Sequence, residues 1–269
     1  MNIYLALTKS HYDVTSREHK LASCVASKEG DRKAPFYKDA IQKYKDQFKD
    51  TLYAKDYEIC FERYYKNSAF GLQAHITFEV STAPGSALVI GNGTASVLET
   101  YLSLHPTYGV PYLPGTALKG LAVRAADQLA QLHAHSELAK DGVEYATLFG
   151  TTEAAGFIQF HDALVTPGTA KDAIQLDVLT PHHQEYNQIS VKEEKKEMPY
   201  AAPRDDDPPV PVPFLHAQGT YKVALSCEGK VSIAKEWLEL AASIVQFALE
   251  HEGIGGKTNA GYGRMVRSS

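Results

Sequence analysis

The stretch Gly253-Ile254-Gly255-Gly256-Lys257-Thr258-Asn259-Ala260-Gly261-Tyr262-Gly263-Arg264 places five glycines, a lysine and an arginine within twelve residues. Glycine has no Cβ, so a glycine-rich backbone can approach a partner closely and present its N–H groups to it. Lys257 and Arg264 add positive charge to the same stretch. A loop of this composition suits phosphate groups, but it also suits a sharp turn between a helix and a strand. Its chemistry alone leaves both interpretations open.

A nucleotide-binding P-loop is one candidate for this stretch, because Gly256-Lys257-Thr258 matches the end of that motif. The motif requires another glycine five residues before Gly256, and the chain has His251 there. It also requires a strand before the loop and a helix after it. Here a helical pattern precedes the loop, and only ten residues, 260–269, remain after Asn259. The sequence therefore does not predict ATP or GTP binding at this loop.

Composition limits the class of protein. The chain has 269 residues, is 44% hydrophobic and carries a formal net charge of -5. It can bury a sizeable core as one large domain or two small ones. Free-standing nucleic-acid binders are usually basic, so any RNA contact must use a local basic groove or one shared with partner subunits. The apolar start at 1–7 is too short for a signal peptide or a membrane span, so no membrane contact is expected.

The cysteines are odd in number and far apart, and no CxxC pair occurs among Cys24, Cys60 and Cys227. This pattern predicts neither a zinc site nor a disulfide framework, and no other metal or cofactor is expected. Buried thiols in a reducing compartment are the simpler account, which favours a cytoplasmic protein.

Periodicity predicts the secondary structure. Apolar residues recur at helical spacing from 34 to 66, with lysines on the opposite face. Alternation at 72–80 indicates a strand. The Pro- and Gly-rich approach at 109–116 then leads into a helix, with Thr116 as its expected N-cap. Orphan N–H groups and the helix dipole make a helix N-terminus a phosphate site, so Thr116 and Lys119 are candidates there.

The second half repeats the pattern around a long interruption. We expect strands at 156–163 and 219–227, a helix at 233–250, and a closing strand at 262–266. The region from about 166 to 213 has little periodicity, and its prolines exclude helix and central strand. Insertions of this length are usually functional or disordered.

This element order predicts an α+β fold with a ferredoxin-like, RRM-like βαββαβ core. The expected organisation is a helical N-terminal extension over 1–70, followed by the core domain over 71–269. The long insertion at about 166–213 precedes the third core strand. Helices on one face of such a sheet leave the other face open, and RRM domains bind RNA on that face.

Eleven histidines raise the possibility of an enzyme. His182 and His183 are adjacent beside Asp177, but neighbouring side chains point apart in an extended chain. His133 and His135 lack the spacing that brings two side chains to one helix face. The chain has no HExxH and no GxSxG motif. A metal-independent ribonuclease could still use one histidine as acid or base, and His182 and His11 are the best candidates.

Several short motifs, in order, resemble those of the RAMP superfamily. Within it the chain is most similar to the sixth-subunit family of Cmr complexes, the type III-B CRISPR effectors. No single motif is specific, and the ordered combination from about 88 to 267 carries the resemblance. The matching segments are Ile90-Gly91-Asn92-Gly93 with Val97-Leu98-Glu99-Thr100, Pro111-Tyr112-Leu113-Pro114-Gly115 with Leu118-Lys119-Gly120, Asp177-Val178-Leu179-Thr180-Pro181-His182, Pro211-Val212-Pro213-Phe214-Leu215, and the glycine loop at 253–264.

The resemblance implies a non-catalytic subunit that caps a ribonucleoprotein filament near the 3′ end of the guide RNA. It implies contacts with guide and target RNA, with the repeating backbone RAMP subunit, with the small helical subunit, and with a neighbouring RAMP subunit. The residues carried over as RNA-binding are Lys119, Gly255, Gly256, Lys257, Thr258 and Arg264, with His182 as a further candidate. Two rivals stay open: a metal-independent endoribonuclease of the RAMP type that processes guide RNA, and a protein-only assembly cap.

Overall fold

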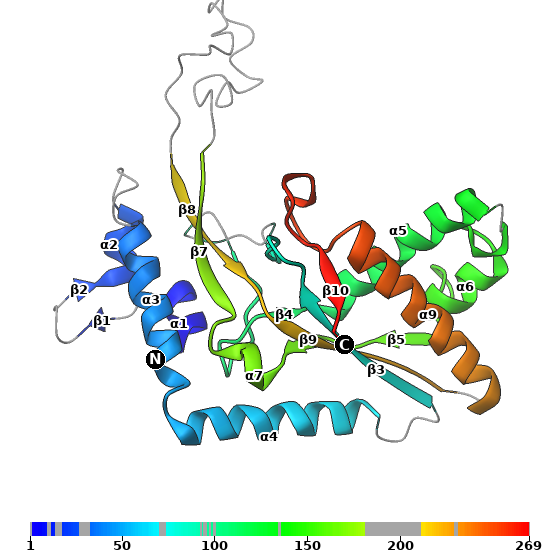
Figure 1. The fold of residues 1–269 in the computed structure, drawn as a ribbon, viewed down its shortest axis with the longest axis horizontal. Coiled ribbons are helices and arrows are strands. Elements are labelled where there is room, and N and C mark those ends of the chain that lie inside the picture. Colours follow the sequence, from blue (N-terminus) through cyan, green and yellow to red (C-terminus); the bar gives the residue numbers. More distant parts are fainter. Residues whose placement is uncertain are drawn as a thin grey trace, which may run out of the picture.

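The computed structural model describes residues 2–9, 12–13, 18–26, 33–69, 74–91, 93, 96, 98, 101–133, 136–180, 211–228 and 231–268. These residues form an antiparallel sheet with helices on both sides (Figure 1). The predicted mixture of helices and sheet is therefore confirmed. Within the described residues, every helix is too short or too polar to cross a membrane.

The main sheet is built around one long pair of strands. Eight consecutive residues of β3 (Ala74–Thr82) pair antiparallel with β9 (Thr220–Cys227), from Ala74 opposite Cys227 to Ser81 opposite Thr220. The other strands extend this pair, all antiparallel. β10 (Met265–Arg267) lies on the free edge of β3, β5 (Ile158–Phe160) and β6 (Ala163–Val165) both pair with β9, and β4 (Tyr112–Leu113) pairs with β6.

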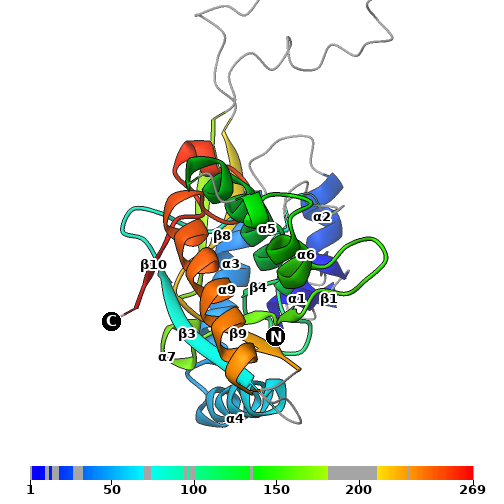
Figure 2. The ribbon, with the colours of Figure 1, turned by 90° about the vertical axis from the view of Figure 1, so that its right-hand side faces the viewer.

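Two long helices pack on one side of this sheet, α5 (Gly115–His133) and α9 (Val231–His251). Their buried faces are lined mostly by alanine, which lets the two helices lie close together. The short helices η2 (Ser136–Leu138) and α6 (Val143–Phe149) continue the layer beyond α5 (Figure 2). The buried positions on the two long helices include Leu118, Ala122, Ala125, Ala126 and Ala130, and Ala234, Leu238, Ala241, Val245 and Ala248.

The helical pattern predicted within the N-terminal segment forms helices in the structure, but they are not one continuous helix. The helical pattern over 34–66 forms two helices, α3 (Lys33–Gln47) and α4 (Thr51–Ser68). Asp50 explains the break, because its carboxylate accepts a 2.9 Å hydrogen bond from the N–H of Leu52 and caps α4. The remaining elements are α1 (Ile3–Thr8), β1 (Tyr12–Asp13), β2 (Glu18–His19) and α2 (Lys20–Ala26).

Helix α4 lies on the side of the sheet opposite α9, where the predicted fold leaves an open face (Figure 1). Hydrogen bonds from two tyrosine hydroxyls of α4 hold this helix against the sheet. Tyr57 donates to the carbonyl of Val165, and Tyr65 donates to the carbonyl of Lys222. The Lys222 ammonium also lies over the Tyr65 ring, 5.1 Å from its centroid. The chain's own helix α4 thus covers the part of this sheet face formed by β6 and β9.

The ends of the predicted insertion are more regular than its sequence suggests. After the short helix α7 (Pro167–Ala170), strand β7 (Ile174–Leu179) pairs with β8 (Val212–Ala217) as a separate two-stranded sheet. Pro213 lies within β8 opposite Val178, where a two-stranded ribbon tolerates the missing N–H. The partner strand lies more than thirty residues away in the sequence, so no local pattern reveals this pairing.

The α4 attachment generates a stability prediction. In Tyr65→Phe, the buried N–H of Leu164 loses its 2.9 Å acceptor and the Lys222 carbonyl loses its donor. We expect a loss of about 1–3 kcal/mol in the free energy of unfolding, measured by urea titration. Tyr145→Phe on α6 is the matched control, because the described structure gives its hydroxyl no hydrogen bond. Equal stability of the two variants would contradict the proposed attachment.

Candidate nucleic-acid interface

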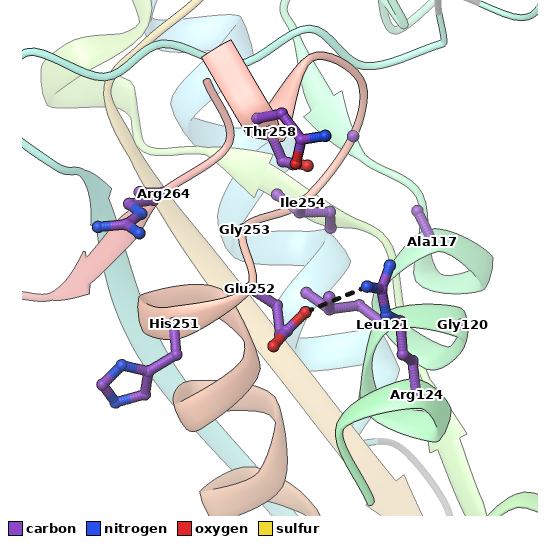
Figure 3. Close-up of a pocket in the computed structure, with 12 residues that line it drawn as sticks. Ala117, Gly120, Leu121, Arg124, His251, Glu252, Gly253, Ile254, Thr258 and Arg264 are labelled. Atoms are coloured by element: carbon purple, nitrogen blue, oxygen red, sulfur yellow. Dashed lines mark ion pairs between the residues drawn. The ribbon is translucent and has the colours of Figure 1, made fainter. Parts of the chain in front are cut away.

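A cavity of about 530 Å³ opens where the first half of α5, the end of α9 and the glycine loop meet (Figure 3). The α5 residues contribute one wall, and the chain leaving α9 contributes the other. The lining residues are Ala117, Gly120, Leu121, Arg124, His251, Glu252, Gly253, Ile254, Gly255, Thr258, Asn259 and Arg264. Three predicted residues from the glycine loop, Gly255, Thr258 and Arg264, are therefore brought together at one cavity.

The glycine loop is held by a buried extended segment, 87–90. The N–H of Gly256 donates to the carbonyl of Val89 at 2.8 Å, and the N–H of Gly263 donates to the carbonyl of Ala87 at 2.7 Å. Within the loop, Ile254 donates to Gly263 at 2.9 Å. The loop is thus fixed at both ends, and the N–H of Gly256 is occupied by the protein itself.

Two loop glycines are required for close packing. Gly255 has a φ of +91°, and a Cβ added there would lie 2.5 Å from the carbonyl oxygen of Val89. Gly263 has a φ of +88°, and its Cβ would lie 2.5 Å from the carbonyl oxygen of Ile254. Both positions combine a left-handed backbone with a close approach to another part of the chain. These glycines therefore shape the loop, whatever it binds.

Between the two anchors, the tip of the loop presents unused hydrogen-bond donors. Within the described part of the chain, the structure gives no acceptor to the N–H groups of Lys257, Thr258 and Asn259 there, nor to that of Gly255, which lies just before the first anchor. Lys257 adopts a left-handed conformation (φ 61°, ψ 30°) and begins the 3₁₀ turn η3 (Thr258–Ala260). A non-glycine residue is strained there by about 1–2 kcal/mol. Successive N–H groups in such a turn form a concave site for anions.

The cavity has positive side chains on two sides. Arg124 on α5 reaches across to Glu252 at 3.5 Å, and the two side chains point toward each other in Figure 3. The Arg124 side chain is 71% exposed, so this ion pair contributes at most about 1 kcal/mol. Arg264 lies on the far side of the α9 terminus, and no described acidic side chain pairs with it. Both guanidinium groups are thus accessible to an anion.

The other predicted site residues that the structure describes do not line this cavity. Lys119 is half-buried on α5 and does not line this cavity; Arg124 is the α5 cation that does. His182 and His11 lie outside the described residues. Thr116 is not the N-cap, because α5 begins at Gly115. Asp162 accepts a 2.7 Å hydrogen bond from the N–H of Gly115, so the start of α5 already holds a carboxylate.

Sequence analysis missed four polar side chains of the cavity, Arg124, His251, Glu252 and Asn259, and it missed Asp162 at the start of α5. Arg124 follows Gly120 by one helical turn, which was the available signal, since residues four apart share a helix face. Asp162 belongs to a different strand–loop segment, and no local spacing places it near Gly115. No three described His, Cys, Asp or Glu side chains form a group that could hold a metal ion.

The glycine loop is also joined to the β7–β8 ribbon. The hydroxyl of Tyr262 donates to the carboxylate of Asp177 at 2.6 Å, and the Tyr262 ring meets Phe214 edge-on at 6.0 Å. Burial raises the pKa of Tyr262 to about 12, and the Asp177 carboxylate adds to this rise. The Tyr262 hydroxyl in turn lowers the pKa of Asp177. Two segments of the resemblance, around 177 and 262, therefore meet in space.

With this geometry established, the class of protein follows from comparison with known families. The RAMP superfamily matches residues 85–266, which include α5, the β7–β8 ribbon, α9 and the whole glycine loop. The chain therefore belongs to the RAMP superfamily. The predicted family resemblance is confirmed.

Individual relatives make the comparison more specific. The chain is 26% identical over 267 residues to the CRISPR system Cmr subunit Cmr6 of Pyrococcus furiosus, covering 81% of this chain and 76% of that protein. A chain in the type III-B Cmr-beta complex bound to cognate target RNA shares the fold, with a TM-score of 0.56 and 19% identity. That match covers 79% of this chain and 66% of the other. The crystal structure of Pyrococcus furiosus Cmr6 matches with a TM-score of 0.44 and 26% identity over 72% and 98%.

The glycine requirement predicts a difference between two alanine variants. Gly255 and Gly261 have nearly equal φ angles, +91° and +90°, but a Cβ on Gly261 would meet nothing within 4 Å. Gly261→Ala therefore costs only the conformational strain, about 1–2 kcal/mol. We expect Gly255→Ala to lower the free energy of unfolding by at least about 1 kcal/mol more, because the loop must move away from Val89. Equal costs in urea titrations would show that Gly255 does not pack as described.

The Tyr262–Asp177 bond predicts a pH dependence. Because the folded pKa of Asp177 is lowered, its contribution is present above the unfolded value of about 3.9 and is lost as pH falls through the folded value. We expect Tyr262→Phe to cost about 1 kcal/mol at pH 7, since Asp177 is partly solvated. The difference in free energy of unfolding between Tyr262→Phe and the parent protein shrinks below about pH 4, where Asp177 becomes protonated in both. A difference that stays constant down to pH 2 in thermal melts would exclude this bond as its source.

Proposed function

We propose that this chain is the Cmr6-like subunit of a type III-B CRISPR effector complex and that it holds an RNA backbone at the glycine-loop cavity. The partners in this proposal are guide and target RNA, the backbone RAMP subunit, the small helical subunit and a neighbouring RAMP subunit. The proposal places the subunit at the end of the filament near the 3′ end of the guide. It draws on family membership and on the likeness to Cmr6 and to a complex containing target RNA.

The observation that carries the RNA-binding role is the set of N–H groups at the loop tip that have no described acceptor, together with two exposed arginines, Arg124 and Arg264, among the residues lining the same cavity. Backbone donors and arginines bind phosphates without reading base sequence, which suits a subunit that must accept variable guides. We propose Gly255, Lys257, Thr258 and Arg264 as phosphate contacts and add Arg124. Gly256 supports the loop through its bond to Val89. The acidic chain then needs only a local positive site, completed by neighbouring subunits.

The fold supports this proposal through the position of the loop. We propose that β3, α5, β5, β9, α9 and β10 are the ferredoxin-like βαββαβ core of a domain over 71–269, preceded by the helical extension over 1–70. The loop joins the last helix of this core to its last strand. Since α4 lies across the β6–β9 part of the sheet face opposite α9, we propose that RNA binds at the helix–loop end of the domain and not across the sheet (Figure 1).

We further propose that the subunit is not catalytic. His251 is the one histidine among the residues lining the described cavity, and Glu252 beside it is paired with Arg124. Phosphate-holding groups surround the cavity, whereas a metal-independent ribonuclease needs an acid and a base placed together. The endoribonuclease and protein-only alternatives make opposite predictions: cleavage of repeat RNA by the isolated chain, or no RNA contact in the complex.

Mutation of the two arginines tests the RNA-binding role. In the assembled complex, we expect Arg124→Ala with Arg264→Ala to weaken RNA binding equally for guides of different sequence. The slope of log affinity against log salt becomes shallower by about 0.7 for each lost phosphate contact. Nitrocellulose binding across a salt series measures this slope. Lys235→Ala, on the exposed face of α9, is the control, and Lys119→Ala tests the remaining predicted cation separately.

The salt series and a separate cleavage assay distinguish the proposal from its alternatives. An unchanged salt slope in the double arginine variant would exclude this cavity as the phosphate site. Specific cleavage of repeat RNA by the isolated chain without metal, abolished by His182→Ala or His11→Ala, would instead establish the endoribonuclease.

A further inference from the structure

A second cavity, of about 440 Å³, lies on the helical face of the molecule. It opens between α5, the η2–α6 segment and α9, the three elements that face the viewer in Figure 2. It shares no lining residue with the glycine-loop cavity, and its floor is mostly aliphatic and aromatic. The lining residues are Leu129, His133, Leu138, Glu144, Leu240, Ser243, Ile244 and Phe247.

Further apolar side chains extend this surface into solvent. Leu132 on α5 is 75% exposed and Val143 at the start of α6 is 70% exposed, and both adjoin lining residues in the sequence. Leu240 and Phe247, two of the α9 residues at this surface, have half-buried side chains. Single exposed apolar residues are ordinary, but a hollow lined and flanked by them is typical of a surface that another protein covers.

Charge identifies the kind of partner. The two segments that flank the hollow, 136–144 and 235–250, contain six acidic residues and two lysines, which is a net charge of -4 (two minus six). One lysine, Lys235, is already 3.8 Å from Glu239. An apolar floor between acidic borders is complementary to an apolar stripe between basic borders. The acidic residues are Glu137, Asp141, Glu144, Glu236, Glu239 and Glu250.

We propose that this α5–α6–α9 groove, defined by the eight lining residues with Leu132 and Val143, binds a basic amphipathic helix of a neighbouring subunit. A helix places apolar residues at i, i+3, i+4 and i+7 into such a groove, and lysines or arginines on its flanks meet the acidic borders. The apolar anchors supply affinity, and the charges supply orientation and selectivity. This inference rests on the proposed function for the existence of an assembly, but it concerns a different surface from the RNA site.

Exposed apolar residues allow a test that leaves the fold intact. In the reconstituted effector complex, we expect Leu132→Asp with Val143→Asp to weaken retention of one neighbouring subunit about tenfold or more, equivalent to about 1.4 kcal/mol. Leu52→Asp on α4, where the leucine is 72% exposed, is the matched control and leaves assembly unchanged. Thermal melts of the isolated variants must agree with that of the parent chain. Wild-type retention in the double variant would overturn the proposal.

A zero-length carbodiimide crosslinker, which joins carboxylates to lysines, identifies the occupant in the same complex. Crosslinks from Glu236 or Glu239 to lysines of a helix in another subunit support the proposal. Crosslinks only to a second copy of this chain, or only to non-helical segments of other subunits, overturn it. If the chain does not enter the complex at all, the proposed function fails as well, whereas normal assembly without groove crosslinks removes only this inference.

Discussion

The buried extended segment 87–90 is the constraint on which the rest of the site depends. Its carbonyl groups at Ala87 and Val89 hold the two ends of the glycine loop, while Leu88 exchanges two backbone hydrogen bonds of 2.7 and 2.8 Å with Ala217 at the end of β8. One segment of four residues therefore fixes both the loop and the β7–β8 ribbon. Because its side chains are buried, the segment cannot shift without disturbing the core.

In this arrangement the two ends of the glycine loop have a structural role, and its tip is the part available for binding. Its ends are committed to the protein through hydrogen bonds and close contacts that no side chain could fit, and only its tip keeps donors available. The strained Lys257 backbone lies at that tip, supported by the anchors on either side. Strain of this kind persists where the surrounding structure determines the conformation, and it is common at binding sites. The Tyr262–Asp177 bond adds a third attachment to the loop.

Sequence periodicity predicted the two long helices and the two central strands, because each buries one regular stripe. The closing strand was predicted at 262–266, whereas β10 covers Met265–Arg267 and buries Met265 alone of its three residues. Periodicity did not predict the break between α3 and α4, which depends on the Asp50 cap, nor the pairing of β7 with β8, whose strands are distant in sequence. The composition of the glycine loop correctly suggested a special backbone. It could not show that Gly256 serves the fold, since that role depends on the nonlocal carbonyl of Val89. The spacing of Arg124 from Gly120 puts the two residues on one helix face, but the place of Arg124 at the cavity depends on how α5 packs against α9.

The central claim is that the tip of the glycine loop contacts RNA in the assembled complex. Photocrosslinking with 4-thiouridine-substituted guide and target RNA, followed by mass spectrometry of the crosslinked peptides, tests it most directly. The account predicts crosslinks in the peptide containing 255–264 and in the α5 peptide containing Arg124. Crosslinks confined to other segments of this chain, or to other subunits alone, would contradict it.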